Sequence, residues 1–443
     1  MTEIRTHIAK LSTKNIGEKV KISGHAETIR GQSSITFIIM RDLTGKIQCV
    51  IDKSIADFEL TRDLSIESVL EIIGIVADSP RQESKIELQI ESFRILNMAE
   101  ALPIPIVDKG NADINSDARM DWRFLIMRRE RDATIMRTLS AVHQGYRNAM
   151  TKMGFVEIGT PKLMPTPSES RAELFKVDYF GKTAYLAQSP QLYKQMGIAG
   201  GLERVFEIGP LFRADPSFTA RHATEFLGMD AEMGYIESFE DVMNALEESM
   251  SCVLDTVRES CGDKVEKHFG VKVEDLRMKM HIPRITMFQA KKILTERGLA
   301  SDDLDLNHTE EKAIGDYAHE KFGSDFIYVT EFPWSKRPFY HKKGVSSDDG
   351  VSPISVSADL IYNGTEIATT AQREEKYATL VEQLHEKGIG QEELQWYLDF
   401  FRYGIPPHGG WGLGSERIAM LLLGVDNIRE VQFLYRGVKR LAP

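Results

Sequence analysis

The sequence predicts an α+β protein with two domains: a small barrel of strands, then a larger domain with an antiparallel sheet flanked by helices. Residues 1–97 contain five short strand-like segments, and residues 115–443 alternate strand-like with helical patterns. Between them, "MAEALPIPIVDKGNADI" (98–114) has two prolines and mixed polarity, which is typical of a linker.

The first domain is expected to be a closed barrel. Its strands should lie at about 19–26, 35–41, 46–52, 68–76 and 85–96, with a helix in "SIADFELTRDL" after the third. Five strands with a helix at that point are the pattern of the oligonucleotide-binding (OB) fold. We therefore expect an OB-fold barrel at 1–97.

The second domain is expected to begin with a long amphipathic helix at about 129–153, because apolar residues recur there at helical spacing. Strand patterns follow in "GFVEIGTPKL", "RVFEIGPLFRA", "EFLGMDAEMGYI", "DFIYVTEFP" and "SVSADLIYNGTEIATTAQ". Their alternation and short connections favour an antiparallel sheet over a doubly wound one. Helical stretches between them predict an insertion at about 237–325.

Composition limits the class of protein. The net charge of −11 excludes a generally basic nucleic-acid coat, although not a local basic face. Three scattered cysteines form no disulfide framework or zinc spacing, which indicates the reducing cytosol. No apolar run reaches the ~18–20 residues of a membrane span, and the first ten residues lack a signal-peptide core. We expect a cytoplasmic protein without a membrane partner.

Two segments carry groups suited to phosphate chemistry. "FRADPSFTARHATEFLGMD" (212–230) places Arg213 at the end of a strand and Arg221 and His222 in the following loop, where two arginines can hold one polyphosphate. "GGWGLGSERIAMLLLG" (409–424) is a glycine-rich strand that leads into a helix beginning near Glu416 and Arg417. The alternatives are an exposed charged loop and a structural glycine turn.

A third segment, "SADLIYNGTEIATTAQR" (357–373), adds a pair of carboxylates. Asp359 and Glu366 lie on neighbouring or continuous strand, where they could hold Mg²⁺ against phosphate oxygens. Strand-face carboxylates are more often solvated, but together with the arginines they indicate phosphoryl chemistry.

The order and spacing of "GFVEIGTPKL", "FRADPSFTARHATEF" and "GLGSERIAM" resemble the three signature motifs of class II aminoacyl-tRNA synthetases. "AQSPQLYKQ", "RPFY", "FRYGIPPHGG" and "KRLAP" are similar to the aspartyl/asparaginyl/lysyl subgroup, and QSPQLYK to its aspartyl members of archaeal and eukaryotic type. The resemblance covers nearly the whole chain. It implies an α+β class II catalytic domain, a homodimer with Pro161 at its interface, and the substrates ATP, L-aspartate and tRNA(Asp), with Mg²⁺ as the cofactor.

The resemblance also implies residue roles. The expected catalytic residues are Arg213 and Arg417. The expected ATP contacts are Arg213, Asp215, Arg221, His222, Glu366, Gly414, Glu416 and Arg417, and the metal ligands are Asp359, Glu366 and Thr369. The expected aspartate-binding residues are Glu169, Gln191, Lys194, Arg213, Asp230, Thr369 and Arg373. In the barrel, Phe37 is expected to stack on an anticodon base and Gln48 to bind a base edge, the alternative being a core role for Phe37.

The expectation for Lys194 also has a physical argument. An ammonium in an apolar segment is costly without an anion, and no acidic residue lies between 180 and 202. We therefore expect the side-chain carboxylate of bound aspartate to pair with Lys194, supported by Arg373. The alternative is a lysine that extends to solvent.

Some positions depart from the family pattern. Asp215 is one methylene shorter than the usual glutamate, and Thr370 replaces a glycine, which we expect to crowd the pocket. "Arg373-Glu374-Glu375" resembles the asparaginyl relatives. Two alternatives therefore stay open beside aspartate–tRNA ligase: an asparaginyl-tRNA synthetase and a non-catalytic tRNA-binding paralogue. Whether tRNA(Asn) is also charged stays open too.

Overall fold

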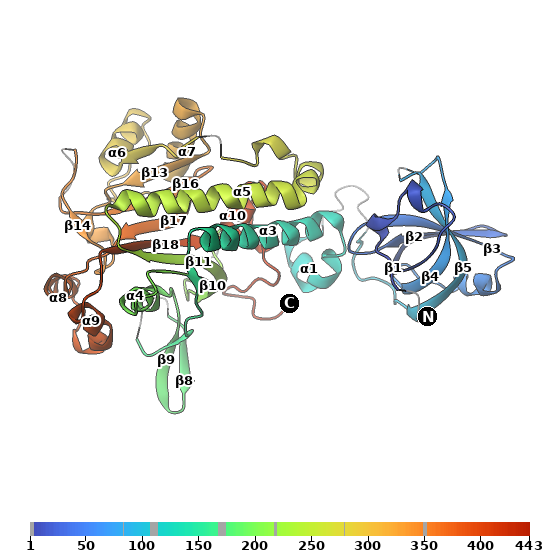
Figure 1. The fold of residues 1–443 in the computed structure, drawn as a ribbon, viewed down its shortest axis with the longest axis horizontal. Coiled ribbons are helices and arrows are strands. Elements are labelled where there is room, and N and C mark those ends of the chain that lie inside the picture. Colours follow the sequence, from blue (N-terminus) through green and yellow to red (C-terminus); the bar gives the residue numbers. More distant parts are fainter. Residues whose placement is uncertain are drawn as a thin grey trace. The chain divides into compact units, whose positions relative to one another are not determined.

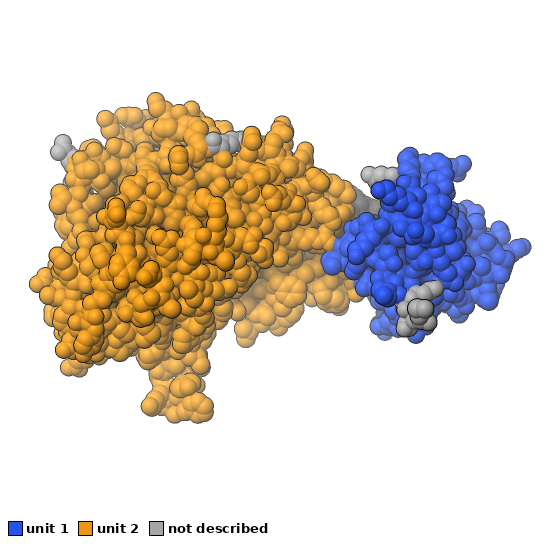
Figure 2. All heavy atoms as spheres, in the orientation of Figure 1, with its two compact units in different colours: residues 1–114 blue, residues 115–443 orange. Residues whose placement is uncertain are grey.

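The computed structural model describes residues 4–82, 84–106, 114–166, 174–216, 219–278, 280–348 and 352–443. The chain divides into two units, residues 1–114 and residues 115–443, which Figure 2 colours separately. Among the described residues, no helix combines the length and the apolar character needed to cross a membrane.

The first unit is a closed five-stranded barrel, as the sequence predicts. Its strands are β1 (Lys19–Gly31), β2 (Ile35–Arg41), β3 (Lys46–Asp52), β4 (Val69–Asp78) and β5 (Ile86–Asn97), in the order β1-β2-β3-β5-β4. Alternate residues such as Ile22, Ile38 and Met40 are fully buried in the barrel core. Short 3₁₀ helices lie at Ile8–Lys10, Thr13–Asn15 and Ala56–Thr61, the last in the predicted place between β3 and β4.

The second unit is built on an eight-stranded sheet in the order β12-β13-β16-β17-β18-β11-β10-β6 (Figure 1). The strands are β6 (Val156–Glu157), β10 (Arg204–Phe212), β11 (Glu225–Gly234), β12 (Arg284–Thr286), β13 (Phe326–Thr330), β16 (Ser357–Tyr362), β17 (Thr365–Gln372) and β18 (His408–Gly414). The central pairs are antiparallel, as expected, but the two edge pairs β12–β13 and β10–β6 are parallel.

The segment "GFVEIGTPKL" does not form the one strand that the sequence predicts. Only β6 joins the large sheet, and β7 (Leu163–Met164) pairs instead with β9 (Lys182–Leu186), which pairs with β8 (Lys176–Tyr179). Pro161 lies between β6 and β7, and proline has no N–H to donate to a strand ladder. The backbone has already left the ladder before Pro161, because the Thr160 N–H donates to the Glu207 carboxylate at 2.9 Å, and the chain then passes to the smaller sheet at β7.

One face of the large sheet is covered by α3 (Glu130–Lys152) and α5 (Phe239–Phe269), which lie side by side (Figure 1). The helical spacing of apolar residues predicted for α3 is confirmed, since Ile135, Val142 and Tyr146 are fully buried. The expected insertion at 237–325 is wrong for its first helix, α5, which is part of the main domain. Its apolar stripe belongs to the main core together with α3 and the sheet, and it continues to Phe269, where Gly270 at φ 73° ends it.

The remaining elements surround this core. α6 (Met287–Glu296) and α7 (His308–Phe322) pack with β12 and β13 at one edge of the sheet, and α8 (Tyr377–Glu386) packs with α9 (Gln395–Arg402). The others are α1 (Ser116–Asp121), α2 (Arg123–Ile126), α4 (Gln191–Ala199), α10 (Ser415–Leu422), α11 (Ile428–Val431), β14 (Lys343–Gly344), β15 (Ile354–Ser355) and 3₁₀ helices at Val273–Asp275, Trp334–Lys336 and Glu392–Leu394.

Candidate functional site

A cavity of about 300 Å³ opens on the face of the sheet away from α3 and α5. Along β11, Gly228 and Asp230 line this cavity, whereas Met229 and Ala231 between them belong to the core. The cavity brings together the following expected residues: Gln191, Lys194, Arg213, Asp215, Arg221, His222, Asp230, Glu366, Thr369, Arg373, Gly414, Glu416 and Arg417.

Three groups of expected residues lie elsewhere. Asp359 is on β16 beside the cavity, paired across the strands with Thr369. Phe37 and Gln48 belong to the barrel, in the other unit. Glu169 lies outside the described residues.

The cavity has an excess of positive charge. Its described lining contains seven lysine and arginine side chains but four carboxylates. Three of these arginines, Arg221, Arg337 and Arg373, also contact carboxylates just outside the lining. Burial lowers the pKa of His222 below its ordinary value, with Arg417 acting in the same direction, and burial holds the pKa of His341 lower still. Because these histidines add little charge near neutral pH, the cavity suits a ligand with several negative charges.

The loop between β10 and β11 carries four of the candidate ATP contacts. Arg213 follows β10 directly, stacks over the Phe226 ring at 5.3 Å, and has no carboxylate within ion-pair distance among the described residues. The Arg221 guanidinium lies 3.4 Å from Glu311 of α7, and His222 Nε2 lies 4.0 Å from Asp215. An uncompensated arginine in a concave site is a candidate anion-binding group.

The junction of β18 and α10 forms another wall. Arg417 donates to the Glu366 backbone carbonyl at 2.8 Å, and its guanidinium lies 3.9 Å from the Glu366 carboxylate. A Cβ on Gly414 would meet no described atom closer than 3.8 Å, so this glycine leaves free space in the cavity. Glu416 lines the cavity, and its carboxylate also accepts from the Leu227 N–H at 3.0 Å and from the Ser415 hydroxyl at 2.8 Å. These bonds tie α10 to β11.

The two candidate metal ligands have unequal surroundings. One oxygen of Asp359 accepts from Arg337 at 2.6 Å, while the other, Oδ1, is buried without a hydrogen-bond partner among the described residues. Burial raises the pKa of Asp359 to about 7, although Arg337 opposes this. Burial also works against ionisation of Glu366, but Arg417 and Arg337 outweigh it and lower the pKa of that carboxyl.

These carboxylates fit a cation shared with a ligand. The Thr369 hydroxyl donates to Glu366 at 3.0 Å, so three oxygen groups gather here. Among the described residues, no three histidines, cysteines or carboxylates come close enough to hold a metal alone. A magnesium ion at this point would therefore need oxygens from its ligand, as nucleotide-bound Mg²⁺ ordinarily does.

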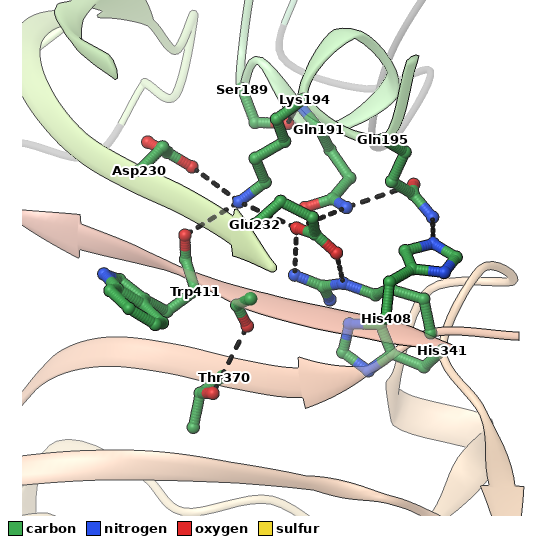
Figure 3. Close-up of polar contacts among 12 residues, drawn as sticks. Ser189, Gln191, Lys194, Gln195, Asp230, Glu232, His341, Thr370, His408 and Trp411 are labelled. Carbon is green, nitrogen blue, oxygen red and sulfur yellow. Dashed lines mark hydrogen bonds and ion pairs between the residues drawn. The ribbon is translucent and has the colours of Figure 1, made fainter. Parts of the chain in front are cut away.

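The structure overturns the premise that Lys194 lacks a protein anion. Its Nζ atom donates to Asp230 Oδ1 at 3.1 Å and to the Trp411 carbonyl at 2.7 Å, and lies 3.6 Å from Glu232 (Figure 3). Lys194 is 3% exposed, which also excludes the alternative of a lysine extending to solvent. Its two anionic partners come from β11, beneath α4, so the absence of acidic residues from the sequence around Lys194 does not mean that it lacks a protein anion.

Sequence reasoning missed Glu232, which joins the two cations of this site. Glu232 is fully buried and accepts from Arg373 Nε at 3.0 Å and from Gln191 Nε2 at 3.4 Å (Figure 3). Burial would raise the pKa of Glu232, but Arg373 and Lys194 overcome it and lower the value. Its position two residues after Asp230 was a usable signal, because residues i and i+2 of a strand share a face.

A series of hydrogen bonds between buried polar side chains lies beside this cluster. Gln195 accepts at its Oε1 from Gln191 at 3.1 Å and from the Tyr397 hydroxyl at 3.0 Å, and its Nε2 lies 2.8 Å from His408 Nε2. His408 Nδ1 lies 2.9 Å from the Pro406 carbonyl. Since a carbonyl can only accept, Nδ1 of His408 carries a proton and Nε2 accepts from Gln195. These hydrogen bonds fix α4 against β18.

Thr370 does not crowd the cavity, contrary to expectation. It is fully buried and donates its hydroxyl to the Gly410 carbonyl at 3.2 Å (Figure 3), whereas its neighbour Thr369 faces the cavity. Successive strand residues face opposite sides, so the departure from glycine falls on the side away from the ligand.

On the barrel, Phe37 and Gln48 lie on one outer face. Phe37 is half-buried and does not belong to the barrel core. Ile38 and Met40 point to the opposite side of β2 and are part of that core. Gln48 faces the same side, two residues along the paired ladder, and donates to Glu87 at 2.9 Å. The core alternative for Phe37 is therefore not supported.

Comparison with known proteins agrees with this geometry. Residues 115–436 match the family of class II tRNA synthetases (D, K and N), and residues 20–96 match the OB-fold nucleic acid binding domain. An Aeropyrum pernix protein named aspartate–tRNA(Asp/Asn) ligase is 39% identical over 433 residues, covering 97% of this chain and 96% of the relative. A Pyrococcus abyssi aspartate–tRNA(Asp) ligase is 38% identical, covering 99% of this chain and 100% of the relative.

Among solved structures, asparaginyl-tRNA synthetase from Pyrococcus horikoshii, complexed with asparaginyl-adenylate, superposes with a TM-score of 0.91 at 30% identity. Both chains are covered completely. The family match spans most of the second unit, and the relatives match from end to end. The chain therefore belongs to the class II aminoacyl-tRNA synthetases of the D, K and N group.

Proposed function

We propose that this enzyme is an aspartate–tRNA ligase, which activates L-aspartate with ATP and transfers the aspartyl group to the 3′ end of tRNA(Asp). The excess of positive charge in the cavity carries this proposal. Both ATP and aspartate are anions, and their reacting groups, a carboxylate and a phosphate, repel each other. Fixed cations that bring such groups together supply positioning and charge stabilisation without an enzyme nucleophile.

Arg213, Arg221, His222 and Arg417 would bind the phosphates of ATP. Arg213 is the candidate for the reacting α-phosphate and the substrate carboxylate, since it lines the cavity, forms no ion pair with a described carboxylate, and acts on Glu366 only from a longer distance. Asp359, Glu366 and Thr369 would hold Mg²⁺, which neutralises phosphate charge when bound. The buried, unpaired Oδ1 of Asp359 supports a cation at this point.

The charges around Lys194 fit an amino acid with an acidic side chain. Lys194 and Arg373 are balanced by Asp230 and Glu232, and Arg213 adds a positive charge without an ion pair to a described carboxylate in the same cavity. L-Aspartate carries two carboxylates and one ammonium, a net charge that complements this excess. Its side-chain carboxylate would approach Lys194 and Arg373, with Gln191 in support, and its ammonium would approach Asp230.

Three further parts of the proposal rest on the family. The barrel face with Phe37 and Gln48 would bind the anticodon of tRNA(Asp), and tRNA(Asn) is a second candidate because the Aeropyrum relative is named for both. The enzyme would act as a homodimer with Mg²⁺ and ATP. The reaction would take place in the cytoplasm.

An asparaginyl-tRNA synthetase is the second candidate. The superposition with the asparaginyl-adenylate complex favours it, as does the sequence Arg373-Glu374-Glu375. Exchange of labelled pyrophosphate into ATP separates the two, since aspartate should drive it and asparagine should not. Exchange driven by asparagine alone would establish the second candidate, and no exchange with either amino acid would indicate a non-catalytic tRNA-binding protein.

A further inference from the structure

Residues 220–224 of the loop that carries Arg221 and His222 are held by a distant part of the chain, residues 428–436, here called the clasp. The Ile428 N–H donates to the Ala220 carbonyl at 2.8 Å, and the Tyr435 hydroxyl donates to the His222 carbonyl at 3.3 Å. The Thr224 N–H donates to the Arg436 carbonyl at 3.1 Å. The clasp donates two of these bonds and the loop donates the third, so the conformation of residues 220–224 depends on the clasp.

The clasp is in turn held from behind by one buried side chain, Arg123 at the start of α2. Its Nη2 donates to the carbonyls of Glu430 and Gln432, both at 2.7 Å, and its Nε donates to the Phe433 carbonyl at 3.2 Å. Arg123 is 1% exposed. A single planar guanidinium thus fixes one carbonyl of α11, that of Glu430, and two carbonyls of the turn that follows it.

Burial of the charged Arg123 side chain lowers the stability of the fold, so stability by itself does not explain why an arginine stands here. The buried guanidinium forms hydrogen bonds only to backbone carbonyls, and its Nη1 atom has no hydrogen-bond partner among the described residues. Asp132 and Glu430 favour its charge from beyond ion-pair distance, but burial outweighs them and lowers the pKa of Arg123. An apolar side chain would fill the space without that cost. The carbonyls at the end of α11 and in the turn after it, however, need donors in fixed positions, which Arg123 supplies.

We propose that Arg123 is a positioning residue for ATP binding: it fixes the clasp, and the clasp fixes the loop that carries Arg221 and His222. This inference rests on the proposed function, because it assumes that ATP occupies the cavity. Arg123 itself does not line the cavity. Its loss should therefore act on ATP affinity through the loop and leave the amino-acid end around Lys194 unchanged.

The test compares Arg123→Met and Arg123→Lys with the wild type. The matched control is Arg297→Met, which removes an arginine that pairs with Glu320 between α6 and α7. Binding of Mg–ATP is measured by calorimetry, and the KM values for ATP and for aspartate are measured by pyrophosphate exchange. We expect Arg123→Met to weaken ATP binding at least about tenfold, since two phosphate-binding side chains must then be ordered during binding.

The KM for aspartate should change less than twofold, Arg123→Lys should lie between Arg123→Met and the wild type, and Arg297→Met should match the wild type. If Arg123→Met does not fold, Arg123→Lys and Tyr435→Phe, which deletes the hydroxyl bonded to His222, carry the same test. ATP affinity within twofold of the wild type in the folded variants, or an equal rise in both KM values, overturns the inference. Failure of the wild type to bind Mg–ATP overturns the proposed function instead.

Discussion

Replacement of Lys194 by methionine tests the charge cluster around α4. Lys194 has two buried carboxylates nearby, Asp230 at 3.1 Å and Glu232 at 3.6 Å, and Glu232 keeps Arg373 as a second partner. In the cluster of Figure 3, Lys194 is the cation that pairs with Asp230, and no other cation drawn there would replace it. Removing one member of a buried ion pair ordinarily costs about 3–5 kcal/mol, because the remaining charge stays buried. We expect a loss of that size in the free energy of unfolding.

The loss should depend on pH. Burial raises the pKa of Asp230 above its ordinary value, and Lys194 opposes that shift. Without Lys194 the pKa rises further, so the folded protein holds a proton that the unfolded chain releases. Stability then falls as pH rises from the unfolded carboxyl's pKa to the folded one, by up to about 1.4 kcal/mol per pH unit. The deficit of Lys194→Met should therefore be larger at pH 8 than at pH 5.

Urea unfolding followed by tryptophan fluorescence measures this deficit, because all four tryptophans lie in the second unit. The matched control is the double variant Lys194→Met/Asp230→Asn, which has no carboxylate left unpaired at position 230. It should recover much of the stability at pH 8 and lose the pH dependence. Equal deficits of the single variant at both pH values, or a double variant no more stable than the single one, would refute the reasoning.

Three other predictions concern the separate parts of the reaction. Arg213→Ala and Arg417→Ala should each slow pyrophosphate exchange by about 3–4 kcal/mol in barrier height, the scale of a lost oxyanion donor, with unchanged urea midpoints; near-normal exchange would remove that arginine from the mechanism. Phe37→Ala should weaken tRNA charging by about 1–3 kcal/mol, the value of a stacked base, and leave exchange unchanged; a fall in both would point to a structural role. Asp359→Asn should raise the Mg²⁺ concentration needed for half-maximal exchange, and an unaltered requirement would exclude Asp359 as a metal ligand.

Much of the fold could be predicted because its signals are local. Alternating apolar and polar residues identified β10, β11, β16 and β17, and apolar residues at helical spacing identified α3. The motif residues then fell into one cavity, since β11, β17 and β18 are neighbours in the sheet. Local patterns could not show that α5 belongs to the core, because an apolar stripe is the same whether it faces the main sheet or an inserted one.

Partners across the sheet could not be predicted from neighbouring sequence. The anions of Lys194 stand 36 and 38 positions later, on β11, and no spacing rule connects α4 to that strand. Arg123 is another example, since its three acceptors are backbone carbonyls more than 300 residues away. Backbone carbonyls have no sequence signature, so this contact is visible only in three dimensions.

The clasp also has a consequence for the order in which the protein is made. Tyr435 and His222 are separated by 213 residues, so the ribosome makes the loop long before the segment that holds it. The sheet strands β10 and β11 can pair as soon as they emerge, but the bonds that the clasp makes to the loop between them cannot form until residues 428–436 follow. A nascent chain that stops short of the clasp would therefore carry Arg213 and Lys194 without a fixed loop beside them. ATP binding should be among the last properties that the growing chain acquires.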